Sequence, residues 1–126
     1  MFAVLGFNSK AQTDKALIRQ GNNDFKKGDY SEAEVKYNKS LDIEYNPKAQ
    51  FNLGDALYEQ GNYEAAEKNF SELTKRKTSK NFESDAYYNL GNTLMAQEKY
   101  AEAFEAYKNS LKANPNDDDA RYNLEY

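Results

Sequence analysis

A chain of 126 residues is long enough for one domain and too short for two separate cores. It contains no cysteine and no histidine, which excludes a zinc site of the usual ligand type, a thiol nucleophile and a Ser-His-Asp triad. The net charge of −4, from 17 basic and 21 acidic residues, argues against a nucleic-acid partner, and the lack of cysteine leaves the redox compartment open.

The first segment, residues 1–11, is apolar from Met1 to Phe7 and ends in Ser9-Lys10-Ala11. Small residues at the first and third of these last positions are typical of a signal-peptidase site, so the segment is predicted to be a partial signal peptide cleaved after Ala11. The apolar run is too short to span a bilayer, and no basic segment precedes it. The alternative is a docked or frayed N-terminal segment of a cytosolic protein.

Three stretches that begin at Gly21, Gly54 and Gly91 repeat one another at spacings of 33 and 37 residues. The columns that match are Tyr30, Tyr63 and Tyr100; Ala33, Ala66 and Ala103; and Tyr37, Phe70 and Tyr107. In the third stretch, small or apolar residues recur at helical spacing both before and after the turn at 98–99. The pattern therefore predicts two helices in each repeat.

Each unit resembles the tetratricopeptide repeat (TPR) family, whose unit is a pair of antiparallel helices. The fit is best at 84–117, where family positions are held by Tyr87, Leu90, Gly91, Leu94, Tyr100, Ala103, Tyr107, Leu111 and Pro115. The resemblance implies an all-α fold, an α-solenoid of helix-turn-helix repeats wound as a right-handed superhelix. It divides the chain into a TPR domain at 14–117, with repeats 14–46, 47–83 and 84–117, and the start of a fourth, truncated repeat at 118–126.

The repeat pattern carries expectations about packing. The three repeated glycines are expected to face the three repeated alanines where paired helices approach closely, and the tyrosines after the turns to fill the gap between helices. Ser31 and Glu34 form an S-x-x-E pattern that predicts a capping box at a helix start. A three-residue insertion at 77–82 is expected to lengthen the connection between the second and third repeats.

The resemblance implies that the first helix of each repeat lines the concave side of the superhelix. The positions that correspond to the family's groove are Ile18, Asn22, Phe25, Phe51, Asn52, Asp55, Tyr58, Tyr88, Asn89, Asn92, Met95 and Tyr122. This aromatic and amide surface suits an extended peptide or a partner helix. For Phe51, Tyr58, Tyr88 and Met95, packing remains as plausible as binding. The core is expected to hold Tyr87, Leu90, Leu94 and Tyr107.

Asn52, Asn89 and Asn123 recur at one equivalent position. In the family, an asparagine ladder at this position can hydrogen-bond the backbone of a bound peptide, because an amide offers both a donor and an acceptor. The alternative is that each asparagine bonds a neighbouring helix or water.

Family members that act as co-chaperones hold the C-terminal carboxylate of a chaperone with a clamp of Lys, Asn, Asn, Lys and Arg. The matching positions here are Ile18, Asn22, Asn52, Asp85 and Asn89. Both asparagines match, but all three cations are missing, and a carboxylate needs them. A chaperone-clamp function is therefore not expected.

Four cations stand within the six residues from Lys75 to Lys80. They follow the predicted end of a helix, where positive charge complements the helix dipole. A solvated loop is the simpler interpretation, and docking to an acidic partner or an anionic membrane surface is the alternative.

Two passages are similar to the TPR proteins of the Bacteroides aerotolerance operon, the BatC kind: AQTDKALIRQGN at 11–22 and NPNDDDARYNLEY at 114–126. That resemblance implies an exported protein, periplasmic or associated with the inner membrane, working beside membrane proteins with von Willebrand factor A-type domains.

The sequence thus favours a protein-interaction scaffold of the bacterial cell envelope that holds a peptide or helix of a partner protein in its concave groove, with no cofactor and no enzymatic activity. The acidic residues lie on helix faces patterned for solvent, so no carboxylate pair is set apart for catalysis. A structural self-assembly element is the alternative: the incomplete terminal repeat would stack on another copy and form a homo-oligomer.

Overall fold

The computed structural model describes residues 10–116 and 118–125, and within these ranges every regular element is a helix. The helices are α2 (Lys10–Lys26), α3 (Tyr30–Ile43), α4 (Pro47–Glu59), α5 (Tyr63–Thr74), α6 (Lys80–Ala96), α7 (Tyr100–Ala113) and α8 (Asp118–Glu125). The all-α prediction is confirmed. Residues 1–9 of the predicted signal peptide lie outside the described residues. None of the helices described is long and apolar enough to cross a bilayer.

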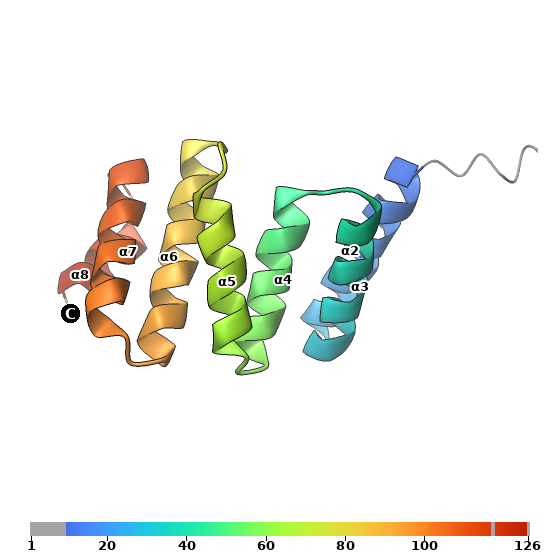
Figure 1. Ribbon diagram of the computed structural model, residues 1–126, viewed down its shortest axis with the longest axis horizontal. Helices are drawn as coiled ribbons and strands as arrows, with labels where there is room; N and C mark the ends of the chain where they lie inside the picture. Colours follow the sequence, from blue (N-terminus) through green and yellow to red (C-terminus); the bar gives the residue numbers. More distant parts are fainter. Residues whose placement is uncertain (1–9, 117, 126) are drawn as a thin grey trace, which may run out of the picture.

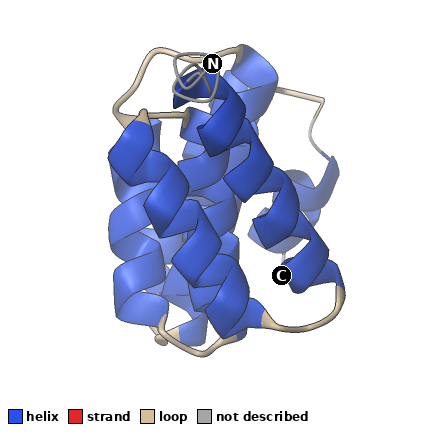
Figure 2. Ribbon diagram, turned by 90° about the vertical axis from the view of Figure 1, so that its right-hand side faces the viewer, coloured by secondary structure: helices blue, strands red, loops and turns tan. Residues whose placement is uncertain are grey.

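Consecutive helices form three pairs, α2 with α3, α4 with α5 and α6 with α7, and each pair packs on the next. Figure 1 shows the pairs standing side by side in chain order, and Figure 2 views the same row from its N-terminal end. The first helices also contact one another, α2 with α4 and α4 with α6. They therefore form a continuous layer along the molecule, and we call its exposed side the groove face.

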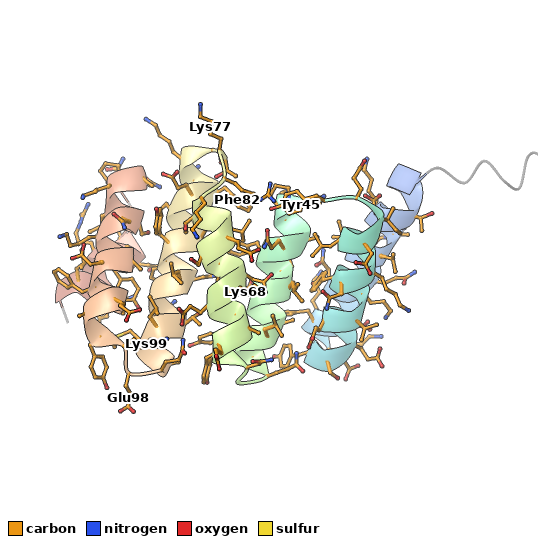
Figure 3. All side chains as sticks on the ribbon, viewed as in Figure 1. Tyr45, Lys68, Lys77, Phe82, Glu98 and Lys99 are labelled. Carbon is orange, nitrogen blue, oxygen red and sulfur yellow. The ribbon has the colours of Figure 1, made fainter. Side chains whose placement is uncertain are left out.

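Each pair turns tightly between its two helices. Gly28 and Gly61 adopt positive φ angles of 82° and 76° at the first two turns, a conformation that costs glycine little. Glu98 takes the same place at the third turn with φ 61°, next to Lys99 (Figure 3), although left-handed backbone costs a non-glycine residue roughly 1 kcal/mol. The third turn thus keeps the same backbone conformation without a glycine, which indicates that the packing of the helix pair imposes it.

The three repeated glycines make room for aromatic rings of the second helices. A Cβ atom added to Gly21 would lie 2.7 Å from Tyr37 Cε1, and one added to Gly54 would lie 2.7 Å from Phe70 Cζ. A Cβ atom added to Gly91 would come closer still to Tyr107 Cε1. A large ring from the second helix thus fills the place that each missing side chain leaves.

Two local predictions need correction. Helix α3 begins at Tyr30 with Asp29 as its N-cap and no side-chain capping bond, so Ser31 lies inside the first turn and makes no capping box with Glu34. Tyr100 is 57% exposed and does not fill a gap between helices.

The exposure of Tyr100 has a simple cause. In the first two repeats the tyrosine after the turn packs edge-on against a ring of the first helix, with centroid distances of 5.0 Å for Phe25–Tyr30 and 5.2 Å for Tyr58–Tyr63. In the third repeat Met95 occupies the position of that ring. The exposed Met95 gives Tyr100 no aromatic surface to cover.

The insertion before the third repeat extends a helix more than it lengthens the loop. Helix α6 starts at Lys80, four residues before Ser84, which corresponds to the first residue of α4. Ser79 caps this extra turn by accepting a hydrogen bond from the backbone N–H of Phe82. Phe82 then packs on Phe51 with ring centroids 5.5 Å apart, so the added turn strengthens the contact between the second and third repeats.

The basic run divides between the loop at 75–79 and the start of α6. The Arg76 guanidinium lies 3.8 Å from the centroid of the Tyr45 ring, a cation–π contact that holds the loop against the preceding repeat. Lys77 points away from the helices at the same end of the molecule (Figure 3).

Candidate functional site

Two hollows lie on the groove face, where the first helices of neighbouring repeats meet. The first hollow, between α2 and α4, has a volume of about 200 Å³ and is lined by Asn22, Phe25, Lys26, Tyr37, Asn52 and Asp55. The second hollow, between α4 and α6, has a volume of about 190 Å³ and is lined by Asp55, Tyr58, Glu59, Phe70, Asn89 and Asn92. Asp55 lines both, so the two hollows form one continuous site.

The buried tyrosines of the second helices fix the orientation of two groove amides. The Tyr37 hydroxyl donates to Asn22 Oδ1 at 2.6 Å, and the Tyr107 hydroxyl donates to Asn92 Oδ1 at 2.6 Å. Burial raises the pKa of both tyrosines to about 12, so each keeps its proton near neutral pH. With their Oδ1 atoms engaged, the two asparagines keep NH₂ groups that donate to no described residue and are available to a ligand.

The repeated asparagines Asn52 and Asn89 are oriented the other way. Asn52 Nδ2 donates to Asn22 Oδ1 at 3.2 Å, and Asn89 Nδ2 donates to Asp55 Oδ1 at 2.9 Å. Each asparagine therefore bonds the preceding repeat, as one of the two sequence interpretations expected. The side-chain oxygen, Oδ1, of each accepts no hydrogen bond from the described residues and is left for a ligand.

Asp55 is the carboxylate at the centre of this row of amides. Burial raises its pKa to about 7, and the nearby charge of Glu59 adds to the shift while the hydrogen bond from Asn89 opposes it. A carboxylate withdrawn from water in this way is a strong acceptor without enough donors. The site can therefore offer donors from two amides, acceptors from two others and one underpartnered negative charge.

The comparisons with known proteins decide the family. The family described as Tetratricopeptide repeat matches residues 18–82 and again residues 84–117. The chain belongs to the tetratricopeptide repeat family. No curated protein sequence matches this TPR domain.

Solved TPR structures resemble the chain over nearly its whole length. The first TPR of Spaghetti (RPAP3), bound to the HSP90 peptide SRMEEVD, is 30% identical with a TM-score of 0.82, covering 90% of this chain and 89% of that one. The second TPR domain of human RPAP3, in complex with the HSP70 peptide SGPTIEEVD, is 25% identical with a TM-score of 0.79, covering 92% of each chain. The Sgt2 TPR domain from Aspergillus fumigatus is 28% identical with a TM-score of 0.79, covering 89% of this chain and 74% of that one.

Seven of the twelve groove residues expected from the sequence line the two hollows, and five lie elsewhere in the TPR domain. Phe51 packs on the Phe70 ring at 5.6 Å, and Tyr88 on the Tyr107 ring at 5.8 Å. Ile18 is half-buried, whereas Met95 and Tyr122 are exposed. For Phe51 and Tyr88 the structure thus shows the packing role that the sequence had left open.

Four lining residues were not expected from the sequence. Lys26 and Glu59 lie one helical turn beyond Asn22 and Asp55, on the same helix face, and this spacing could have revealed them. Tyr37 and Phe70 come from the second helices and had been noted only as members of a repeated column. Tyr37 comes 15 residues after Asn22, and Phe70 comes 15 residues after Asp55. This spacing does not reveal a site by itself; the hydrogen bond from Tyr37 to Asn22 shows that the second helices contribute to it.

A third hollow lies off the groove face, between α6 and α7, and has a volume of about 380 Å³. Its lining includes Tyr87, Leu90 and Leu94. Leu94 is buried like Tyr107, as the sequence predicted, but Tyr87 and Leu90 are half-buried, so their assignment wholly to the core was wrong. The equivalent residues of the second repeat, Gln50 and Leu53, are buried. The 17-residue helix α6 follows that repeat, whereas the 8-residue helix α8 follows this one and covers less of it.

Proposed function

We propose that this TPR domain is a protein-interaction module, with no catalysis of its own, that binds an extended peptide or a helix of a partner protein along the groove face. The observation that carries the proposal is the fixed row of amides. Asn22 and Asn92 present donors, Asn52 and Asn89 present acceptors, and each is held by a hydrogen bond within the domain. Preorganised amides can bind the backbone of a peptide without the entropic cost of ordering them.

The structural neighbours support a peptide as the ligand, because two TPR domains of RPAP3 are known in complex with chaperone peptides that end in EEVD. The ligand here is proposed to be a different peptide. The positions that would supply clamp cations are occupied by Ile18, Asp85 and Asn89. Acidic peptide ends need several charged donors, and the two hollows have one lysine, Lys26, against two carboxylates, Asp55 and Glu59.

The test is selection of binders from a display library of random dodecapeptides, followed by affinity measurement on the selected peptides. We expect the Asn52→Ala/Asn89→Ala variant to bind them about tenfold or more weakly, since it loses two groove acceptors and the hydrogen bonds that Asn52 and Asn89 donate to Asn22 and Asp55. The matched control is Asn38→Ala/Asn116→Ala, which removes two exposed asparagines away from the groove face. Equal affinity of both variants and the native domain would refute groove binding.

We further propose that the domain works in the bacterial cell envelope, exported to the periplasm or held at the inner membrane, in an aerotolerance-type complex. What supports this is the apolar segment at 1–7 followed by a cleavage-like Ser9-Lys10-Ala11, together with the two passages that resemble BatC-like proteins. The partners would then be membrane proteins with von Willebrand factor A-type domains. Cell fractionation tests the location, and recovery of the protein in the cytosol alone with Met1 to Ala11 still attached would contradict it.

A second candidate function is self-assembly through the third hollow. The half-buried Tyr87 and Leu90 support it, since another copy of the chain could cover this hollow. The oligomeric state in solution separates the two candidates.

A further inference from the structure

The second repeat departs from its neighbours at one pair of residues. In the first and third repeats an asparagine and a tyrosine that are 15 residues apart share a 2.6 Å hydrogen bond, Tyr37 to Asn22 and Tyr107 to Asn92. At the same two places the second repeat has Asp55 and Phe70. Both members of the pair therefore differ. The carboxylate of Asp55 accepts hydrogen bonds and needs donors more than an amide does, and the Phe70 ring has no hydroxyl to donate one.

Asp55 is consequently left with little to balance its charge. The hydrogen bond from Asn89 Nδ2 reaches one of its oxygens, and no described lysine or arginine forms an ion pair with it. Burial raises its pKa to about 7, and the hydrogen bond from Asn89 only partly offsets that rise. A carboxylate has room for several hydrogen bonds, so this one retains unused acceptor capacity that points to a donor from outside the chain.

The surroundings of Asp55 indicate what that donor is. The second hollow contains two carboxylates, Asp55 and Glu59, which stand one turn apart on α4, and no lysine or arginine belongs to its described lining. Tyr58 and Phe70 add two aromatic rings, whose faces attract cations and cover methylene groups. The hollow of about 190 Å³ has the size of a single long side chain rather than of a whole ligand.

We propose that the second hollow binds a lysine or arginine side chain of the partner peptide, with Asp55 and Glu59 accepting its charged N–H groups and Tyr58 and Phe70 contacting its aliphatic stem. The proposal rests on the groove-binding function and adds the chemical class of the ligand. It assigns specificity to one repeat: the amides of the other positions bind backbone, whereas the second repeat selects a basic residue.

The test uses the dodecapeptides selected by display on the native domain and, separately, on Asp55→Asn/Phe70→Tyr. That double variant gives the second repeat the same Asn–Tyr pair as the first and third, so it retains a proven local packing, which far-UV circular dichroism checks. We expect the native domain to enrich lysine or arginine at one position of the aligned peptides, and the double variant to lose that preference.

Affinity measurements on individual selected peptides make the test quantitative. Replacing the enriched basic residue by norleucine removes its charge and keeps its stem. We expect this change to weaken binding to the native domain about tenfold and binding to Asp55→Asn much less, because only the exposed Glu59 is then left to accept a charge-assisted bond. Glu59→Gln should give a smaller loss, since Glu59 is exposed.

The outcomes separate the two levels of the proposal. Peptides whose binding depends on Asn52 and Asn89, but which show no basic position, would overturn the assignment of the second hollow and leave groove binding standing. A basic position that persists unchanged on Asp55→Asn/Phe70→Tyr would also overturn it. If no selected peptide depends on Asn52 and Asn89, groove binding itself fails, and the assignment fails with it.

Discussion

At the scale of single residues, the groove combines groups whose protonation is fixed with one whose protonation is not. Tyr37 and Tyr107 stay protonated because burial raises their pKa values to about 12. Asp55, in contrast, has a pKa raised to about 7 and therefore titrates near neutral pH. The charge of the groove face is thus set by the ambient pH at this one residue.

The raised pKa of Asp55 predicts how stability depends on pH. Between about pH 4 and pH 7 the folded state holds the proton of Asp55 that the unfolded chain releases, so its contribution to stability falls as the pH rises through that window. The charged or titratable groups that share its two hollows are Lys26 of α2, Tyr37 of α3 and Tyr58 and Glu59 of α4, and the lining residues from α5 and α6 are uncharged. No cation there is paired with Asp55 to cancel the effect.

We therefore expect Asp55→Asn to be more stable than the native domain by about 1–2 kcal/mol near pH 8, and the difference to vanish near pH 4. Urea unfolding at the two pH values measures it. Asp42→Asn, at an exposed position, is the control and should show no comparable pH-dependent gain. A gain from Asp55→Asn that is the same at both pH values would mean that the charge of Asp55 is not the cause.

At the scale of helices, each pair is held by a ring from the second helix packed on a glycine of the first. The third pair is the tightest, because a Cβ atom placed on Gly91 would come nearer to its ring, that of Tyr107, than in the other two pairs. The Tyr107 ring cannot easily move away, since its hydroxyl is bonded to Asn92 on the groove face. Helix packing and groove geometry are therefore coupled through this tyrosine.

Gly91→Ala should expose that coupling. Overpacking costs about 3 kcal/mol at such a contact, and the better helix propensity of alanine offsets about 1 kcal/mol, which leaves a net loss of about 2 kcal/mol. Chemical denaturation measures the loss. In a Tyr107→Leu background the ring is gone, so the same substitution should become neutral or stabilising. An equal loss in both backgrounds would show that the ring is not what excludes a side chain from position 91.

At the scale of the whole molecule, the row of helix pairs offers two faces to partners: the groove face and the third hollow between α6 and α7. A stable association of two copies usually buries at least about 1,000 Å² with good complementarity. The third hollow is lined by eight residues, among them Glu102 and Glu105, which would face a second copy with like charge.

We accordingly expect light scattering to give the monomer mass of 14.5 kDa across a range of protein concentrations. Leu90→Glu places a further charge in the third hollow and serves as the matched variant. A mass that rises with concentration, and returns to the monomer value in Leu90→Glu, would favour self-assembly over the groove as the working surface.

The sequence by itself determined the architecture, because small residues and rings recur at intervals that only stacked helix pairs explain. It also indicated most of the groove, since family positions on the first helices fall at regular offsets from Gly21, Gly54 and Gly91. Local rules were less reliable: the capping pattern at Ser31 and Glu34 forms no cap, and the insertion became a helical turn that carries Phe82 onto Phe51.

Only the tertiary structure decided which way each groove amide faces and how Asp55 differs from its equivalents. These properties depend on contacts between helices that are distant in sequence: Tyr37 reaches Asn22 from the second helix, and Asn89 reaches Asp55 from the next repeat. Periodicity reports which face a side chain occupies. Hydrogen-bond partners and loss of solvent, which set orientation and pKa, arise only when the helices are packed together.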